Sequence, residues 1–255
     1  MAVALTWWGH ATATVVDSGV RVLTDPVLTD GVAHLHRRRG SRPPGASRRA
    51  DVVLVSHLHA DHLHVRSLAM VDAAAVIVVP RGARDAVAGL VRLRRRDIRE
   101  VGPGDVVEVG SVRIRAVPAE HDGRRHPLAR RHVMPLGYVV EGSSRTYFAG
   151  DTDLFDGMAA AVGGCDLALL PVGGWGPGLG EGHLTADRAA VAAGRLAARV
   201  AVPIHFGTLW PRGLAAVAPD EFLPPGAEFV RAARVHAPST WARELRPGES
   251  LSVDD

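Results

Sequence analysis

A short run of metal-binding side chains follows directly after a strongly apolar segment of the chain. Residues 51–56 read Asp-Val-Val-Leu-Val-Ser, which is typical of a strand covered on both faces. The next six residues hold four potential ligands, His57, His59, Asp61 and His62. In an extended strand exit, residues two apart point the same way, so His57 and His59 can grip one ion. The turn that follows can aim Asp61 and His62 at a second position, so the run predicts a metal site at a strand end.

The types of ligand narrow the choice of metal. Imidazole nitrogens and a carboxylate suit Zn²⁺, Mn²⁺ or Fe²⁺, whereas a structural zinc site usually contains thiolates. Cys165 is the only cysteine, so no intramolecular disulfide can form. It begins the apolar run 165–170, and we expect it to be a thiol in the core rather than a ligand or a nucleophile.

Composition sets the class of protein. The chain has 255 residues, 47% of them hydrophobic, which is enough for a sizeable core. A net charge of +3 is small although the pI is about 9.9, because the basic residues are all Arg, which stays protonated. We therefore expect a small-molecule substrate and no nucleic-acid partner. A chain without Lys, rich in Ala, Arg, Gly and Val, indicates a GC-rich bacterial genome.

The ends and the hydropathy pattern predict the location. The first residues lack the basic-then-apolar pattern of a signal peptide. No apolar run reaches the roughly 18 residues that a membrane-spanning helix needs. We expect a cytoplasmic protein without a transmembrane segment, and the sequence gives no indication of its oligomeric state.

The order of predicted elements favours one α/β domain over residues 1–255, because no repeat, low-complexity tract or linker divides the chain. Strands dominate the first half, and strands alternate with helices in the second. Asp17-Ser18-Gly19 has the chemistry of a hairpin turn, and Thr185 is a candidate N-cap. The predicted strands are 3–8, 13–16, 20–24, 51–56, 75–79, 106–109, 112–117, 136–140, 145–149, 167–170, 200–204 and 250–253. The predicted helices are 65–70, 82–90, 154–162 and 185–198.

Loops rich in arginine leave two interpretations open. Residues 31–49 read as an exposed loop or flap, placed where it could form a lid over the metal site. Its basic side chains and those of the later loop are solvated surface charge, or some of them line the mouth of the site and hold a phosphate or carboxylate. These side chains are Arg37, Arg38, Arg39, Arg42, Arg48, Arg49, Arg124 and Arg125. The run 92–96 reads as a solvated helix end.

The pattern His-x-His-x-Asp-His resembles the signature of the metallo-β-lactamase superfamily. Three later motifs match that family in order: Pro-Ala-Glu-His ending at His121, Phe-Ala-Gly-Asp-Thr around Asp151, and Pro-Ile-His-Phe-Gly-Thr around His205. The resemblance implies a four-layer αββα sandwich. It also implies that His121 is the third ligand of the first ion, that Asp151 bridges two ions, and that His205 joins Asp61 and His62 on the second.

Other segments resemble one branch of that superfamily, which contains N-acyl-phosphatidylethanolamine phospholipase D and L-ascorbate-6-phosphate lactonase. They are Thr-Trp-Trp-Gly-His-Ala-Thr at 6–12, Leu-Thr-Asp-Pro at 23–26, and Gly-His-Leu-Thr at 182–185. The resemblance makes Asp25 a hydrogen-bonding support of the ligand loop and places His10 and His183 close to the metals or the substrate. The segment 121–132 departs from the phospholipase relatives, which often carry an aromatic residue after the ligand histidine.

These motifs predict a dinuclear metal-dependent hydrolase that activates water against a phosphodiester, lactone or other ester, with an anionic substrate expected. The cofactors are two divalent ions, Zn²⁺ first, with Mn²⁺ or Fe²⁺ as alternatives. Asp61 and His183 are the candidate catalytic residues, His183 as a substrate contact or an acid. Two other functions stay open: a flavodiiron-like oxidoreductase on the same scaffold, and a metal-binding protein without catalysis.

Overall fold

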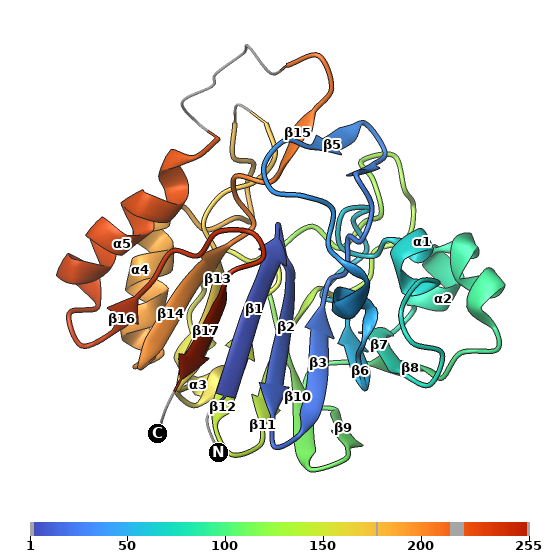
Figure 1. The fold of residues 1–255 in the computed structure, drawn as a ribbon, viewed down its shortest axis with the longest axis horizontal. Helices are drawn as coiled ribbons and strands as arrows, with labels where there is room; N and C mark the ends of the chain where they lie inside the picture. The colour runs from blue at the N-terminus through green and yellow to red at the C-terminus, as the bar shows by residue number, and fades with distance from the viewer. Residues whose placement is uncertain (1–2, 177, 215–221, 254–255) are drawn as a thin grey trace.

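Two mixed β-sheets pack face to face in the computed structural model, which describes residues 3–176, 178–214 and 222–253 (Figure 1). The first sheet has the order β17 (Ser250–Val253), β1 (Val3–Gly9), β2 (Thr12–Asp17), β3 (Val20–Thr24), β6 (Val52–Leu54), β7 (Val76–Pro80), β8 (Ile98–Val101). The second has the order β16 (Trp241–Ala242), β14 (Val200–Ile204), β13 (Leu167–Pro171), β12 (Arg145–Phe148), β11 (Leu136–Glu141), β10 (Val112–Pro118), β9 (Val106–Val109). A small sheet of β15 (Leu209–Pro211), β5 (Leu35–Arg37) and β4 (Gly31–Val32) lies at the top of Figure 1.

Helices cover the outer faces of both large sheets. α1 (Val65–Leu68), α2 (Ala83–Ala86) and the 3₁₀ helix η2 (Ala88–Leu93) pack on the first sheet, where Leu68 and Leu90 belong to one apolar cluster with Ile77. A second 3₁₀ helix, η1 (Gly45–Arg48), precedes β6. On the second sheet lie α3 (Met158–Val162), α4 (Ala186–Arg195) and α5 (Pro224–His236), at the left of Figure 1. This layering confirms the predicted αββα sandwich.

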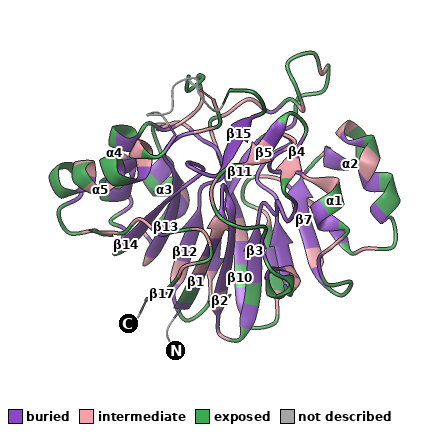
Figure 2. Ribbon diagram, turned by 45° about the horizontal axis from the view of Figure 1, so that its top comes forward, coloured by how far each residue is buried: buried purple, intermediate pink, exposed green. Residues whose placement is uncertain are grey.

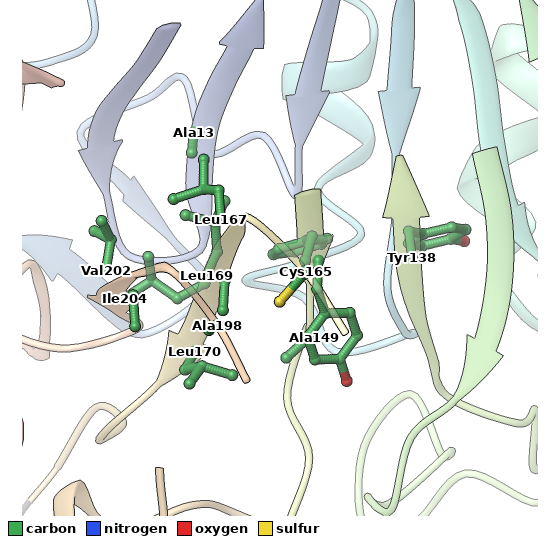
Figure 3. Close-up of a cluster of buried hydrophobic side chains, with 14 of the residues drawn as sticks. Ala13, Tyr138, Ala149, Cys165, Leu167, Leu169, Leu170, Ala198, Val202 and Ile204 are labelled. Carbon is green, nitrogen blue, oxygen red and sulfur yellow. The ribbon is translucent and has the colours of Figure 1, made fainter. Parts of the chain in front are cut away.

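The main core lies between the two sheets, because their strands turn apolar side chains toward each other. Figure 3 shows Ala13 from β2 in one cluster with Leu167 and Leu169 from β13. Figure 2 shows the same pattern over the whole fold, with buried strands inside and exposed outer faces on the helices. Cys165 lies in this core, and burial raises the pKa of its thiol to about 12, so the predicted core thiol is what the structure contains.

Several predicted boundaries were wrong. Residues 31–49 are not irregular throughout, since β4 and β5 form there and β5 pairs with β15. The helix expected from 154 begins only at Met158, because Gly157 adopts a left-handed conformation with φ of 84°. The helix expected over 82–90 breaks between α2 and η2 at Val87.

Besides β4 and β5, the elements that were not predicted include helix α5 and strand β8. Helix α5 begins with Pro224 and Pro225, which suggested a loop, although Pro fits the first turn of a helix, where no N–H partner is needed. Strand β8 follows an arginine-rich run and was missed as well. By contrast, the turn at Ser18 and Gly19 has φ of 51° and 81°, the positive pair that the predicted hairpin requires.

The directions of the strands in the two sheets determine where the site lies. In the first sheet, β1, β3 and β6 run the same way, because β2 is antiparallel to both of its neighbours and β6 is parallel to β3. In the second sheet, β10, β12, β13 and β14 share one direction for the same kind of reason. The carboxyl ends of these strands therefore carry their following residues to one edge of the sandwich, where ligands bind in open α/β sheets.

Candidate metal centre

All seven predicted ligands converge at the carboxyl-end edge of the sandwich. The segment from His57 follows β6, and three separate strands supply the rest: His121 follows β10, Asp151 follows β12 and His205 follows β14. Their ligand atoms fall into groups that lie within 4.8 Å of one another. The structure therefore brings together the residues that the sequence predicted to meet.

Asp151 lies at the centre of the arrangement and is 2% exposed. Its Oδ2 lies 3.2 Å from Nε2 of both His62 and His205, 3.9 Å from Nε2 of His57 and 4.0 Å from Nε2 of His121. Its other oxygen, Oδ1, is buried without a hydrogen-bond partner among the described residues. A buried carboxylate oxygen without a partner costs free energy, so this atom indicates a group that the protein itself does not supply.

The ligand atoms form two sets on either side of Asp151. In the first, Nδ1 of His59 lies 2.9 Å from Nε2 of His57 and 3.1 Å from Nε2 of His121. In the second, Nε2 of His62 lies 3.0 Å from Nε2 of His205 and 3.6 Å from Oδ2 of Asp61. Ligand atoms around a tetrahedral zinc, bonded at about 2.0–2.1 Å, lie roughly 3.3 Å from one another. Both sets therefore have the spacing of ligands around an ion.

The outer nitrogens of four histidines are all held by hydrogen bonds. Each Nδ1–H donates to a fixed acceptor: His57 to Ser56 Oγ (2.9 Å), His62 to Asp25 Oδ2 (2.6 Å), His121 to Gly182 O (2.8 Å) and His205 to Gly173 O (2.8 Å). With the proton on Nδ1, the lone pair of Nε2 faces the centre of the site. Metal-binding histidines are oriented in this way, so the donor set fits two divalent ions of the kind expected.

Asp25 is the anchor predicted for the ligand loop. Its Oδ1 accepts the main-chain N–H of Ser56 at 2.8 Å, and its Oδ2 accepts the Ser56 hydroxyl at 2.5 Å as well as the His62 imidazole. The backbone around the site is strained, since His10, Asp25 and His205 all have positive φ (53°, 31° and 64°). Such strain is common where a fold holds side chains for function.

The charges of the site depend on burial and on neighbouring groups. Burial lowers the pKa of His57 well below its usual value and that of His121 to about 4, so both imidazoles are neutral near pH 7. Burial also opposes charge on Asp61 and Asp151, but the surrounding histidines outweigh it and hold both pKa values well below the usual range. For His62, burial is outweighed by three carboxylates, which raise its pKa well above the usual value.

His183 lies beside this cluster at the mouth of the site, as predicted. Its Nδ1–H is shared between the carbonyls of Gly180 and Glu181 at 3.1 Å each, and its Nε2 lies 3.6 Å from Oδ2 of Asp151. Its side chain is 19% exposed, so a molecule entering the site can reach it. Burial lowers its pKa, but the hydrogen bond and charge of Asp151 outweigh burial and raise it.

Arg125 supports the ligand loop, a role that the sequence did not suggest. Its Nη1 donates to the main-chain carbonyls of Leu58 and Leu63, the latter at 2.9 Å. These two carbonyls flank the turn that carries His59, Asp61 and His62. One guanidinium thus closes the ligand turn on itself.

Most of the other basic side chains also bind groups of the protein and do not extend freely into solvent. Arg37 donates to the carbonyls of Trp8 and Val27, and Arg42 donates to that of Leu28. Arg124 forms a bidentate pair with Asp122, the residue after His121. In the run 92–96, Arg96 is not simply solvated, because it donates to the carbonyls of residues 68, 71 and 72. These contacts indicate that the arginines stabilise the loops by hydrogen bonds and ion pairs within the protein.

The chain matches the model of the beta-lactamase superfamily domain over residues 20–206. It belongs to the metallo-β-lactamase superfamily. A metal-dependent hydrolase named UPF0173 from Nitratidesulfovibrio vulgaris is 31% identical over 267 residues, covering 100% of this chain and 97% of the relative. N-acyl-phosphatidylethanolamine-hydrolyzing phospholipase D 1 from Caenorhabditis elegans is 30% identical, covering 82% of this chain and 64% of the relative.

A solved structure shares the fold of the whole chain. Igni18, a metallo hydrolase from Ignicoccus hospitalis, superposes with a TM-score of 0.73 at 20% identity and covers 100% of both chains. Together with the family match, these relatives make the chain a metal-dependent hydrolase of this superfamily. The predicted branch is also supported, since a phospholipase D of that branch is among the relatives.

Four participants in the site were missed at the sequence level. Ser56 precedes His57 directly, so its position was a usable signal. Arg125 was interpreted only as solvated surface charge or as a side chain that binds substrate at the mouth of the site. The carbonyls of Gly173 and Gly182 carry no side-chain signal, and only the folded glycine-rich loop brings them to His205 and His121.

Proposed function

We propose that this hydrolase is dinuclear and cleaves a phosphodiester, lactone or other ester of a small, negatively charged molecule. The observation that carries the proposal is the central place of Asp151 between two sets of ligand atoms, with no partner for Oδ1 among the described residues. The first ion would be held by His57, His59 and His121, and the second by Asp61, His62 and His205, with Asp151 shared. Nitrogen and carboxylate ligands favour Zn²⁺ in both positions, with Mn²⁺ or Fe²⁺ as the other candidates.

Two such ions supply a water with a lowered pKa and a positive field at the scissile oxygen. The residues of the chain supply the rest. Asp25, Ser56 and Arg125 fix the ligand loop before any substrate enters. Asp61, ionised and 5% exposed, can accept the proton of the attacking water.

His183 is the candidate acid of the reaction. Its Nδ1–H is fixed on two carbonyls, so Nε2 is the atom that faces the site. Without bound ions, the hydrogen bond and charge of Asp151 raise its pKa, and Nε2 is the atom that would carry the second proton. From there it can donate to a leaving oxygen or bind a substrate oxyanion.

Negative charge on the substrate would be met by the ions rather than by the loop arginines. Arg37, Arg42 and Arg125 already donate to main-chain carbonyls near the site. Among the described residues, no helix is long and apolar enough to cross a membrane. We propose a small molecule as the substrate, which can reach the partly exposed side chain of His183.

The test compares His59→Ala with wild-type protein for bound metal and for hydrolysis of generic phosphodiesters and lactones. We expect the variant to lose metal and activity together. Unchanged metal content would defeat the ligand assignment, and retained hydrolysis at reduced metal would defeat the mechanism. His126→Ala is the matched control, because His126 is exposed and lies outside the ligand groups of the described residues.

The same samples separate the two other functions. An iron-loaded protein that consumes oxygen would support the flavodiiron-like oxidoreductase instead. A protein that is saturated with metal but hydrolyses none of a broad panel of esters would support binding without catalysis. Relatives that are named as hydrolases favour the proposed hydrolase over both of these functions.

A further inference from the structure

His10 is the one histidine of the buried cluster that the proposed ligand sets do not use. It follows β1 and is 1% exposed. Its main chain is fixed on three sides: its N–H donates to Thr208 Oγ1 at 2.9 Å, and its carbonyl accepts from Trp7 Nε1 at 2.8 Å and from the His205 N–H at 3.0 Å. These contacts hold its backbone at a φ of 53°, a conformation that costs free energy for a side chain of this size.

The ring of His10 lies against the second set of ligands. Its Nε2 lies 2.8 Å from Oδ2 of Asp61, and its ring centroid lies 4.1 Å from that of His205. Two roles fit this position. Nε2 can be a further ligand, or it can carry a proton and donate it to Asp61.

The outer nitrogen decides between these roles. The histidines His57, His62, His121 and His205 each donate Nδ1–H to a fixed acceptor, which leaves Nε2 bare. For His10, Nδ1 has no such acceptor among the described residues, while Nε2 lies 2.8 Å from a carboxylate oxygen of Asp61. A neutral imidazole carries one proton, and a carboxylate at 2.8 Å needs a donor, so the proton of His10 belongs on Nε2.

We propose that His10 is a positioning residue for the second ion: its Nε2–H holds Oδ2 of Asp61 and so fixes the rotation of that ligand carboxylate. The inference rests on the proposed dinuclear site and deepens it. A carboxylate held before the ion arrives loses less freedom on binding it, and removal of such an outer hydrogen bond typically weakens metal affinity about 10- to 100-fold. His10 thereby acts through Asp61 and not on the substrate.

The first experiment titrates metal-free wild type, His10→Gln and His10→Met with Co²⁺, following its visible absorption and the bound stoichiometry. Gln and Met have similar length, but only Gln has an amide N–H to offer Asp61. We expect unchanged uptake of the first ion in all three proteins. Uptake of the second ion should weaken about 10- to 100-fold in His10→Met and recover most of that loss in His10→Gln.

Three outcomes would overturn the proposal. Wild-type affinity for the second ion in His10→Met would show that Asp61 needs no support. Equal weakening in Gln and Met, with an altered Co²⁺ spectrum of the second step, would make His10 a direct ligand. Uptake of only one ion by wild type would remove the second position and the dinuclear function together.

A second measurement needs no folded variant. Nitrogen-15 NMR of Zn²⁺-loaded wild type reports which imidazole nitrogen carries the proton. We expect Nε2–H for His10, against Nδ1–H for His57, His62, His121 and His205; Nδ1–H on His10 would contradict the proposal. Neither measurement requires turnover, so a protein that binds two ions but hydrolyses nothing would defeat the proposed function while leaving the role of His10 intact.

Discussion

Asp17 and Asp151 are buried carboxylates at opposite ends of the same sandwich, 1% and 2% exposed. Asp17 is the last residue of β2, next to the turn that leads to β3. Its Oδ1 accepts from the Ser18 hydroxyl at 2.9 Å and from the main chain and hydroxyl of Ser143 at 2.9 and 2.6 Å. Ser143 lies in the turn between β11 and β12, so Asp17 ties the two sheets together. Asp151 has one oxygen among histidine nitrogens, and its other oxygen has no partner in the part of the chain that the structure describes.

The difference teaches how a fold marks a binding position. A buried carboxylate must be satisfied, since an unpaired one costs several kcal/mol. At the Asp17 end the protein supplies every donor, and the acid serves stability. At the Asp151 end, histidine nitrogens surround Oδ2, while no donor among the described residues reaches Oδ1, so the protein leaves part of this carboxylate unsatisfied. Only the second end requires something from outside.

The largest expected effect follows from Asp151→Asn. An amide keeps the volume but loses the charge shared by both ligand sets, so we expect bound metal to fall and hydrolysis to drop by at least roughly 1000-fold, equivalent to several kcal/mol. Metal analysis and a phosphodiester assay measure this. Asp17→Asn is the control, with metal content expected at the wild-type level. If Asp151→Asn kept both ions and the wild-type rate of hydrolysis, Asp151 would not differ in function from Asp17.

The next effect is on stability at the other end. Asp17→Asn replaces an acceptor oxygen by an amide donor opposite N–H and O–H groups, so we expect the metal-free protein to lose about 2–3 kcal/mol of unfolding free energy. Urea denaturation of wild type and variant, both without metal, gives the value. A loss below about 0.5 kcal/mol would mean that the tie between Asp17 and Ser143 does not hold the sheets together.

A smaller effect is expected at Arg125, on the metal end. Arg125→Met keeps much of the side-chain volume but frees the carbonyls of Leu58 and Leu63, so the ligand turn loosens and metal affinity should fall about 10-fold. Competition with a chelator measures it. Arg124→Met is the matched control, because Arg124 pairs with the exposed side chain of Asp122 and should leave affinity unchanged. Equal losses in both variants would point to general electrostatics rather than to the turn.

The smallest effect is a pH dependence that belongs to the Asp17 end. Burial raises the pKa of Asp17, but the hydrogen bonds from Ser143 and Ser18 outweigh it and lower the pKa below its usual value. Stability from this group is therefore present above the unfolded pKa, about 3.9, and is lost as the pH falls through the folded value. The gap between wild type and Asp17→Asn should narrow below about pH 4 in urea titrations. A gap that widened there would reverse the sign of the shift.

The motifs predicted which side chains meet better than the hydropathy pattern predicted the helices and strands. The four proposed ligands in one segment and the three at later strand ends could be found because metal binding needs particular side chains at strand exits. Helix α5 was missed because its first residues, Pro224 and Pro225, are typical of a loop. Strands β4 and β5 were missed because two or three residues are too few to show the alternation of apolar and polar side chains. Arg125 was misread because its partners are main-chain carbonyls, which no sequence pattern displays.

The sequence by itself determined which side chains are available as ligands, namely imidazoles and carboxylates, together with their order and the strands whose ends carry them. The tertiary structure decided how those groups are held. It placed Asp151 between the two sets, gave four of the five proposed ligand histidines an outer acceptor, and set His10 against Asp61. The reason is physical, since the type of a side chain is local, whereas its orientation depends on contacts between segments far apart in the chain, such as His10 with Thr208.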